Sequence, residues 1–287
     1  MKQKSVKKIL PAHQVNMDGN LLFEALPATG TEFIDPFLLI HHWNDELPGG
    51  YRQQEIGVGP HPHRGFSPVT LIYEGEIQHR DSFGNNCVVK KGGVQWMFAG
   101  RGITHSERPS KKMAEEGGKL EIIQLWVNAP ASSKMDLAYY KAINAKEIPC
   151  YKGKHVKLDV ICGKFQDLIG PAQHLSPIQL YTITIQKNSK FRIPSPSNHN
   201  TIIYLLDGKI KANDKIAIGR DMIWLNQNGD FIELEAIEST RFVYLEAEPL
   251  NEPVAKYGPF VMTNETEIME AIRDAQMGKM GILIEEF

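Results

Sequence analysis

Two short segments of the chain each carry a pair of potential metal ligands spaced two residues apart. His61 and His63 lie within Gly-Pro-His-Pro-His-Arg-Gly-Phe, and His105 and Glu107 follow about forty residues later. In an extended strand, residues i and i+2 point to the same face, so each pair can present two donor atoms to one point. Three imidazoles and one carboxylate suit a divalent transition metal. A single His-x-His pair would favour a surface or structural role, but two such pairs among glycines and prolines predict a metal site.

Strands must position these residues, because most of the chain has a β pattern. Short apolar or alternating runs are separated by Gly, Asp, Asn and Pro at short intervals, which is typical of a sandwich or barrel and not of βαβ units. We therefore predict an all-β fold. The runs that carry this prediction are residues 37–40, 69–73, 120–127, 180–185, 201–206 and 242–245.

Helix is predicted mainly near the C-terminus. Asn264 can cap a helix in which Glu267 completes a capping box, and Gly278 stands where a C-terminal stop belongs. The apolar residues that share one face of this helix are Ile268, Ala271, Ile272 and Ala275. This pattern indicates a packing helix that closes the fold. Residues 113–118 are charged and rich in Gly, and we predict a loop there, beside the second ligand pair.

A faint internal repeat relates the two halves of the chain. The segment around Gly75 resembles the segment around Gly208, which indicates two copies of one β domain. Counting from these glycines, the positions of His61, His63 and His105 are held in the second half by Pro194, Pro196 and either Phe231 or Ile232. We predict a metal-binding domain over residues 1–145 and a domain without ligands over 146–287, which ends in the helix. His199 lies near the vacated place, but alone.

The composition places limits on the partners. The 287 residues carry a formal charge of −2, so no global basic field would recruit nucleic acid directly. The three cysteines are widely spaced and form no CxxC pair, which favours a reducing compartment. The basic N-terminus is not followed by an apolar signal core, and no run reaches the length of a membrane span. We expect a cytoplasmic monomer that binds no membrane, or a nuclear protein in a eukaryote.

The motifs resemble the pirin family of the cupin superfamily. The resemblance rests on His61-Pro-His63-Arg-Gly-Phe, Glu74-Gly75, Gln95-Trp-Met-x-Ala-Gly-Arg-Gly-x-x-His105-x-Glu107, residues 34–39 and residues 257–262. It implies a bicupin, in which two jelly-roll β-barrels pack face to face and the N-terminal one binds a metal, usually Fe(2+). Mn, Ni, Cu and Zn remain alternatives. The family's ligands fall on His61, His63, His105 and Glu107, the four residues that spacing selected.

The sequence departs from the family pattern at two places. Ser67-Pro68 replaces an acidic residue and a threonine of many members, and it should alter the pocket wall at most. The stretch His41-His42-Trp43 is also divergent, since an acidic residue often precedes the second His. We predict that His42 lies at the lip of the pocket or packs in the core.

The resemblance implies a quercetin 2,3-dioxygenase-like enzyme that opens the central ring of flavonols with O2. Glu107 would then act as a ligand and as the base that takes the hydroxyl proton. Arg64 and Arg101 would counter a substrate anion or bind neighbouring carbonyl groups, and Gln124 and Glu121 are candidates for orienting the ligands. Other family members are regulators, so the alternative is a redox-sensing metalloprotein that binds partner proteins. A third option is isomerisation or hydrolysis with the metal as a Lewis acid.

Overall fold

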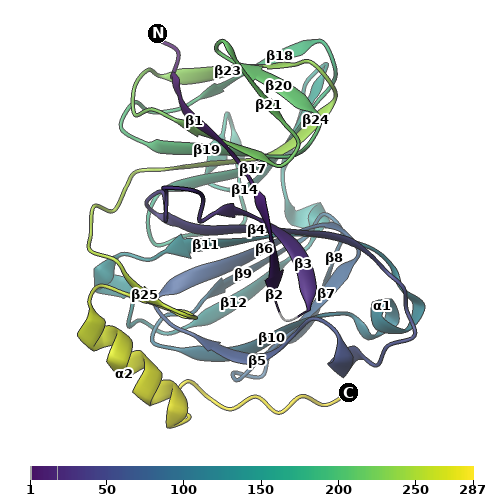
Figure 1. The fold of residues 1–287 in the computed structure, drawn as a ribbon, viewed down its shortest axis with the longest axis vertical. Helices are drawn as coiled ribbons and strands as arrows, with labels where there is room; N and C mark the ends of the chain where they lie inside the picture. The colour runs from purple at the N-terminus through teal and green to yellow at the C-terminus, as the bar shows by residue number, and fades with distance from the viewer. Residues whose placement is uncertain (1, 18) are drawn as a thin grey trace. The chain divides into compact units, whose positions relative to one another are not determined.

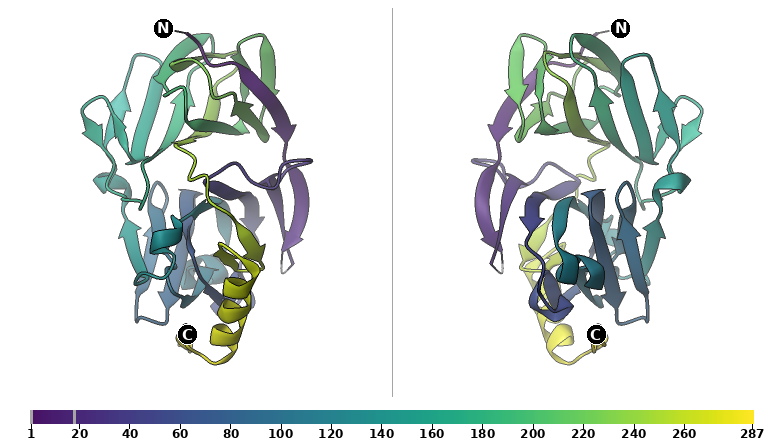
Figure 2. Two further views of the ribbon diagram at one scale, coloured as in Figure 1. Left: turned by 90° about the vertical axis from the view of Figure 1, so that its left-hand side faces the viewer. Right: turned by 90° about the vertical axis from the view of Figure 1, so that its right-hand side faces the viewer.

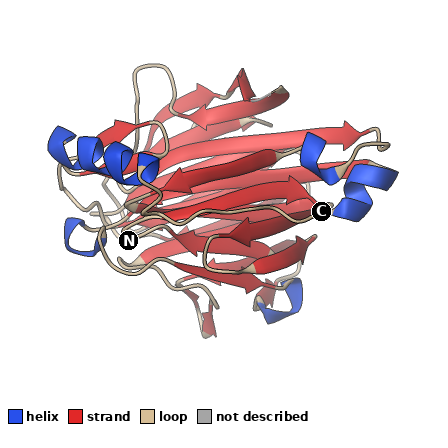
Figure 3. Ribbon diagram, turned by 90° about the horizontal axis from the view of Figure 1, so that it is seen from below, coloured by secondary structure: helices blue, strands red, loops and turns tan. Residues whose placement is uncertain are grey.

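The computed structural model describes residues 2–17 and 19–287, and strands make up most of it (Figure 3). The chain forms two compact units, neither of which is one continuous segment. Unit 1 comprises residues 1–14, 23–36 and 147–250, and unit 2 comprises residues 15–22, 37–146 and 251–287. The predicted domains 1–145 and 146–287 differ from these units at both ends. The N-terminal strand pairs within unit 1, and the C-terminal helix packs within unit 2.

Unit 2 contains the two predicted ligand segments and is built from two sheets (Figure 1). Most of its strands belong to a seven-stranded sheet with the order β12 (Tyr139–Ile143), β9 (Val94–Phe98), β6 (Phe66–Glu74), β11 (Gly118–Asn128), β4 (Phe37–Leu47), β3 (Asn20–Leu26) and β2 (His13–Met17). Residues 13–14 of β2 and 23–26 of β3 are assigned to unit 1. The four-stranded sheet of unit 2 has the order β5 (Val58–His63), β10 (Ile103–Pro109), β7 (Glu76–Asp81) and β8 (Asn86–Lys90). A short hairpin follows near the C-terminus and consists of β25 (Ala255–Tyr257) and β26 (Phe260–Met262).

Unit 1 has the same plan of one seven-stranded and one four-stranded sheet. The larger sheet has the order β1 (Val6–Pro11), β22 (Asp221–Leu225), β19 (Asn200–Asp207), β24 (Thr240–Ala247), β17 (Ile178–Ile185), β14 (Val156–Cys162) and β13 (Cys150–Lys152). The smaller sheet has the order β18 (Ser189–Pro194), β23 (Phe231–Ala236), β20 (Lys209–Ala212) and β21 (Lys215–Ile218). A two-stranded ribbon joins β15 (Lys164–Phe165) to β16 (Leu168–Ile169). The predicted all-β architecture with two like halves is confirmed.

Two α-helices occur among the described residues. Helix α2 (Glu265–Gln276) begins after Asn264, whose side chain accepts a hydrogen bond from the backbone N–H of Glu267, as predicted. It lies against unit 2, beside β25 and β26 (Figure 2). Helix α1 (Lys111–Glu116) corrects the loop predicted over 113–118. Ser110 caps this helix and Met113 is buried on its inner face, so capping and packing outweigh the charged, Gly-rich composition.

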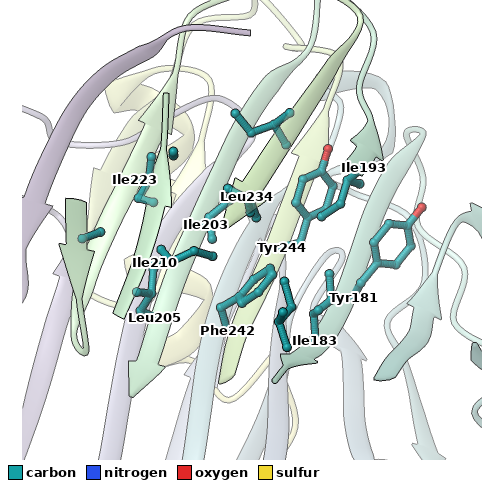
Figure 4. Close-up of a cluster of buried hydrophobic side chains, with 14 of the residues drawn as sticks. Tyr181, Ile183, Ile193, Ile203, Leu205, Ile210, Ile223, Leu234, Phe242 and Tyr244 are labelled. Atoms are coloured by element: carbon teal, nitrogen blue, oxygen red, sulfur yellow. The ribbon is translucent and has the colours of Figure 1, made fainter. Parts of the chain in front are cut away.

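The core of unit 1 is apolar and filled with side chains. Ile183, Leu205 and Phe242 are almost fully buried within it, together with residues from both sheets (Figure 4). Burying each such side chain stabilises the fold by roughly 1.5–3 kcal/mol relative to leaving it exposed. No helix within residues 2–17 or 19–287 is long and apolar enough to cross a membrane.

Strand pairing supports the internal repeat at the level of single residues. In unit 2, His61 of β5 lies opposite His105 of β10. In unit 1, Pro194 of β18 lies opposite Phe231 of β23. These are the positions that counting along the sequence had matched, so the two halves share one register and differ in the residues that occupy it.

Candidate metal centre

Three histidines of the four-stranded sheet in unit 2 converge on one point. One ring nitrogen from each of His61, His63 and His105 can be chosen so that all three lie within 4.8 Å of one another. The Nε2 atoms of His61 and His63 are 3.0 Å apart. The ring centroids of His61 and His105 are separated by 4.4 Å, and those of His63 and His105 by 5.0 Å. A divalent ion could bind to all three rings from this point.

The pairing of β5 with β10 creates this convergence. His61 and His63 alternate along β5, and the antiparallel register places His105 directly across from His61. A bulge after His105 shifts the register, so that Glu107 lies opposite Val58. The i, i+2 spacing and this strand pairing together gather the imidazoles, and Glu107 follows two residues after His105 on the same strand.

Backbone carbonyls orient two of the three rings. The Nδ1 atom of His61 is 2.8 Å from the carbonyl oxygen of Gly59, and Nδ1 of His63 is 3.2 Å from that of Pro259. A carbonyl accepts only, so each Nδ1 donates and each Nε2 of a neutral ring carries the lone pair. Two lone pairs facing each other at 3.0 Å repel unless a cation or proton lies between them. The donor set therefore fits a metal ion.

Burial keeps the rings of His63 and His105 uncharged. The pKa of His63 lies well below its usual value because burial disfavours the imidazolium, and neighbouring His61 adds to the effect. The pKa of His105 is lowered in the same way, first by burial and then by His61, His63 and His79. The buried Nε2 atom of His105 has no hydrogen-bond partner in the described structure. A neutral imidazole with an unused nitrogen is the form that binds metal.

Glu107 lies in the same cavity but outside the three-histidine cluster. Its Oε1 accepts a hydrogen bond from Thr70 Oγ1 at 2.9 Å, and its Oε2 accepts one from Gln124 Nε2 at 2.6 Å. Gln124 therefore supports the predicted fourth ligand. Glu121 points away from the cavity, because it lies an odd number of residues from Gln124 along β11. Its Oε1 lies 3.3 Å from Nε2 of the buried His42. Glu107 as a ligand stays a prediction.

A cavity of about 370 Å³ opens onto His61, His63 and Glu107. No lysine or arginine is among the described residues that line it. His41 faces this cavity, whereas His42 is fully buried on the other side of β4, so of the two positions predicted for His42, packing in the core is the one observed. The wall is mainly apolar and is formed by Met17, Leu22, Trp43, Val58, Ile77, Ile122, Trp126, Gly258 and Pro259.

The two arginines beside the ligands, Arg64 and Arg101, lie outside the cavity lining. Arg64 donates through Nε to the carbonyl oxygen of Arg101 at 2.7 Å, and its Nη2 lies 3.1 Å from Oδ2 of Asp274 in α2. Arg101 itself is exposed. Of the two roles predicted for Arg64, binding of a neighbouring carbonyl is the one observed.

Sequence reasoning overlooked a second His-x-acid pair, on the strand next to β10. His79 and Asp81 of β7 are buried, and Nε2 of His79 lies 2.9 Å from Oδ2 of Asp81. The Nδ1 atoms of His79 and His105 are 3.4 Å apart. The signal was the same i, i+2 spacing, in a strand whose only apolar residue is Ile77.

Comparisons with known proteins identify the family of this chain. The pirin family model matches residues 20–127, and the model of the pirin C-terminal cupin domain matches residues 180–281. The chain therefore belongs to the pirin family, and its two units are cupin domains.

The similar proteins include bacterial and plant members. A provisionally named quercetin 2,3-dioxygenase of Pseudomonas aeruginosa is 36% identical over 86% of this chain and 87% of its own length. A pirin-like protein of Solanum lycopersicum is 30% identical, covering 96% of this chain and 92% of its own. A crystal structure described as quercetin 2,3-dioxygenase from Acinetobacter baumannii has a TM-score of 0.92 and 37% identity, covering 99% and 100% of the two chains. These relatives support an oxidoreductase-type enzyme.

Proposed function

We propose that this pirin is a metal-dependent dioxygenase that cleaves flavonol-type substrates, with His61, His63, His105 and Glu107 holding one divalent metal, foremost Fe(2+). The observation that carries the proposal is the apolar cavity of about 370 Å³ that opens onto His61, His63 and Glu107. Its volume falls in the range of small-molecule sites, which is roughly 300–1,000 Å³. A regulator that acts only through its surface has no need of such a cavity, so the enzyme is favoured over the regulatory alternative.

The cavity wall favours an aromatic substrate. Trp43 and Trp126 offer flat apolar surfaces, and the lining described contains no lysine or arginine to counter a small dianion. A planar ring system packed on these side chains would exclude water from the histidine cluster. Gln124 and His41 lie opposite each other on β11 and β4 and supply polar contacts for substrate hydroxyl groups.

Glu107 is the proposed base. Thr70 and Gln124 each donate to one oxygen of its carboxylate, which holds the group in one orientation beside the cavity. It would take the proton of the substrate hydroxyl, so that an electron-rich enolate can react with O2. A divalent metal bound by the histidines supplies Lewis acidity to the substrate oxygen and a means of activating O2. Overall, the substrate gains the two atoms of O2 and loses one carbon as carbon monoxide.

The test uses metal-free protein reconstituted anaerobically with Fe(II), Mn(II), Ni(II), Cu(II) or Zn(II) in turn. Each form is mixed with quercetin under air, and flavonol absorbance, oxygen uptake and carbon monoxide release are followed. We expect turnover with at least one ion, and its loss in Glu107→Gln. Glu121→Gln is the matched control, because Glu121 is a buried carboxylate on the side of β11 that faces away from the cavity. One ion bound per chain without turnover for any metal would contradict the proposal.

A further inference from the structure

Of the three histidines, His105 differs in the partner of its Nδ1 atom, which faces another side chain. The Nδ1 atoms of His61 and His63 face backbone carbonyls, whereas Nδ1 of His105 faces Nδ1 of His79 at 3.4 Å. The hydrogen bond between these two rings can run in either direction, because each Nδ1 can donate or accept. What lies behind His79 therefore decides the tautomer of His105.

Asp81 decides that direction. Its Oδ1 accepts from the backbone N–H groups of Phe83 and Asn85, and its Oδ2 accepts from Asn85 Nδ2 at 2.7 Å and faces Nε2 of His79 at 2.9 Å. Three N–H donors from Phe83 and Asn85 surround this carboxyl and stabilise its ionised form. An ionised carboxylate accepts only, so the proton of His79 lies on Nε2. Its Nδ1 is then a lone pair that accepts from His105.

This sequence of bonds leaves His105 with a proton on Nδ1 and a lone pair on Nε2. That Nε2 is the buried atom without a partner among the described residues. The ring of Tyr140 stacks on His79 with centroids 3.7 Å apart and planes 4° apart, which holds the imidazole in its plane. Both His79 and Asp81 are buried, so water does not compete for these bonds.

We propose that Asp81 and His79 are positioning residues that hold His105 in the tautomer able to bind the metal through Nε2. The inference rests on the proposed metal site but does not depend on which reaction follows. Loss of an outer hydrogen-bond partner of a ligating histidine costs about 10–100-fold in metal affinity. Asn in place of Asp81 should reverse the direction of both hydrogen bonds, from Asp81 to His79 and from His79 to His105. The amide N–H would face Nε2 of His79, so the proton of His79 would move to its Nδ1. His105 would then accept through Nδ1 and carry its proton on Nε2.

The experiment measures Asp81→Asn beside the wild-type protein. Zinc affinity is determined by competition with a chromophoric chelator, and nitrogen-15 NMR of the histidine rings in the metal-free protein reports each tautomer. We expect Nδ1–H on His105 in the wild type, Nε2–H in Asp81→Asn, and zinc affinity about 10–100-fold weaker in the variant. Glu121→Gln is the control, because it alters the other buried carboxylate–histidine pair of this unit and should leave zinc affinity unchanged.

The outcomes separate the two proposals. Wild-type zinc affinity in Asp81→Asn, or Nε2–H on His105 in the wild type, would overturn the positioning role while leaving the dioxygenase proposal intact. If the wild type binds no metal, the proposed function fails, and the NMR tautomer still tests the relay. If Asp81→Asn does not fold, the wild-type spectrum and the zinc affinity of His79→Phe, which keeps a ring against Tyr140, decide instead.

Discussion

The two cupin units pair their strands in the same register, but unit 2 has metal-binding side chains at positions where unit 1 has apolar ones. Where unit 2 places His61 across from His105, unit 1 places Pro194 across from Phe231. The residues that support Glu107 differ as well. Thr70 and Gln124 lie opposite each other on β6 and β11, whereas Ile203 and Tyr244 lie opposite each other on β19 and β24.

The comparison separates what the fold needs from what the site needs. Unit 1 keeps both sheets although its interior at these positions is apolar and includes Ile203 and Tyr244 (Figure 4). Strand pairing and core burial are therefore sufficient for this architecture. Unit 2 instead uses its interior for a cavity and a cluster of polar side chains.

His199 of unit 1 further illustrates the difference. The sequence placed it near the vacated site, and its Nδ1 is 3.1 Å from Glu246, whose other oxygen accepts from Tyr244. Burial and the nearby Glu246 raise the pKa of Tyr244 well above its usual value. The described part of unit 1 gathers no second histidine there, so this polar group is satisfied internally.

The largest effect should come from removing one ligand of unit 2. We expect His61→Ala to reduce metal content from one ion per chain to a small fraction, because the remaining donors no longer surround one point. Circular dichroism should show both units folded, since unit 1 has this architecture without ligands. Elemental analysis measures the ion, and His199→Ala is the matched control. Full metal occupancy in His61→Ala would refute the assignment.

A cavity in the core of unit 1 should lower the stability of the protein and leave its metal content unchanged. Phe242→Ala removes a fully buried ring and should lower the free energy of unfolding by about 3–5 kcal/mol. Metal content should not change, because Phe242 lies outside the ligand unit. Denaturant titration measures the stability, and Ile218→Ala, at a residue that is 54% exposed, should change it little. Loss of metal in the folded Phe242→Ala protein would show that the two units are coupled.

The C-terminal segment should contribute a smaller stabilisation to unit 2. Glu285 binds the guanidinium of Arg108, the residue after Glu107, with two contacts of 2.8 Å. We expect Glu285→Gln to lower the free energy of unfolding by about 1–3 kcal/mol, because the charged guanidinium of Arg108 would then face a neutral amide in place of a carboxylate. Glu286→Gln, at an exposed neighbour, is the control. Equal stability of the two variants in urea would exclude this role for the pair.

The smallest effect should be the acid sensitivity of the metal-free site. His63 and His105 have lowered pKa values when folded, whereas unfolded histidine titrates near 6.5. Below that pH the unfolded chain binds more protons, so stability should fall as the pH decreases. Between pH 7 and 6 each histidine should cost less than about 1 kcal/mol. Urea titrations over this range measure the slope, and a His63→Gln, His105→Gln double variant should have a shallower one.

Much of this protein is determined by its sequence alone. Alternating apolar runs bounded by Gly and Pro produced the strands, since side-chain direction in a strand repeats every two residues. The same period placed His61 with His63, and His105 with Glu107, on one face of an extended segment, and the cap at Asn264 defined the start of α2. These features are local, so neighbouring residues suffice to predict them.

Only the tertiary structure decided the rest, because it depends on contacts between distant segments. Contacts between distant segments assign the two chain ends to different units and place His41, not His42, at the cavity. The pairing of β5 with β10 places His105 opposite His61. Strand pairing also determines the position of His79 behind His105, since the two rings come from different strands and meet only when β7 pairs with β10. Spacing along the chain selects candidate ligands, and pairing between strands determines what supports them.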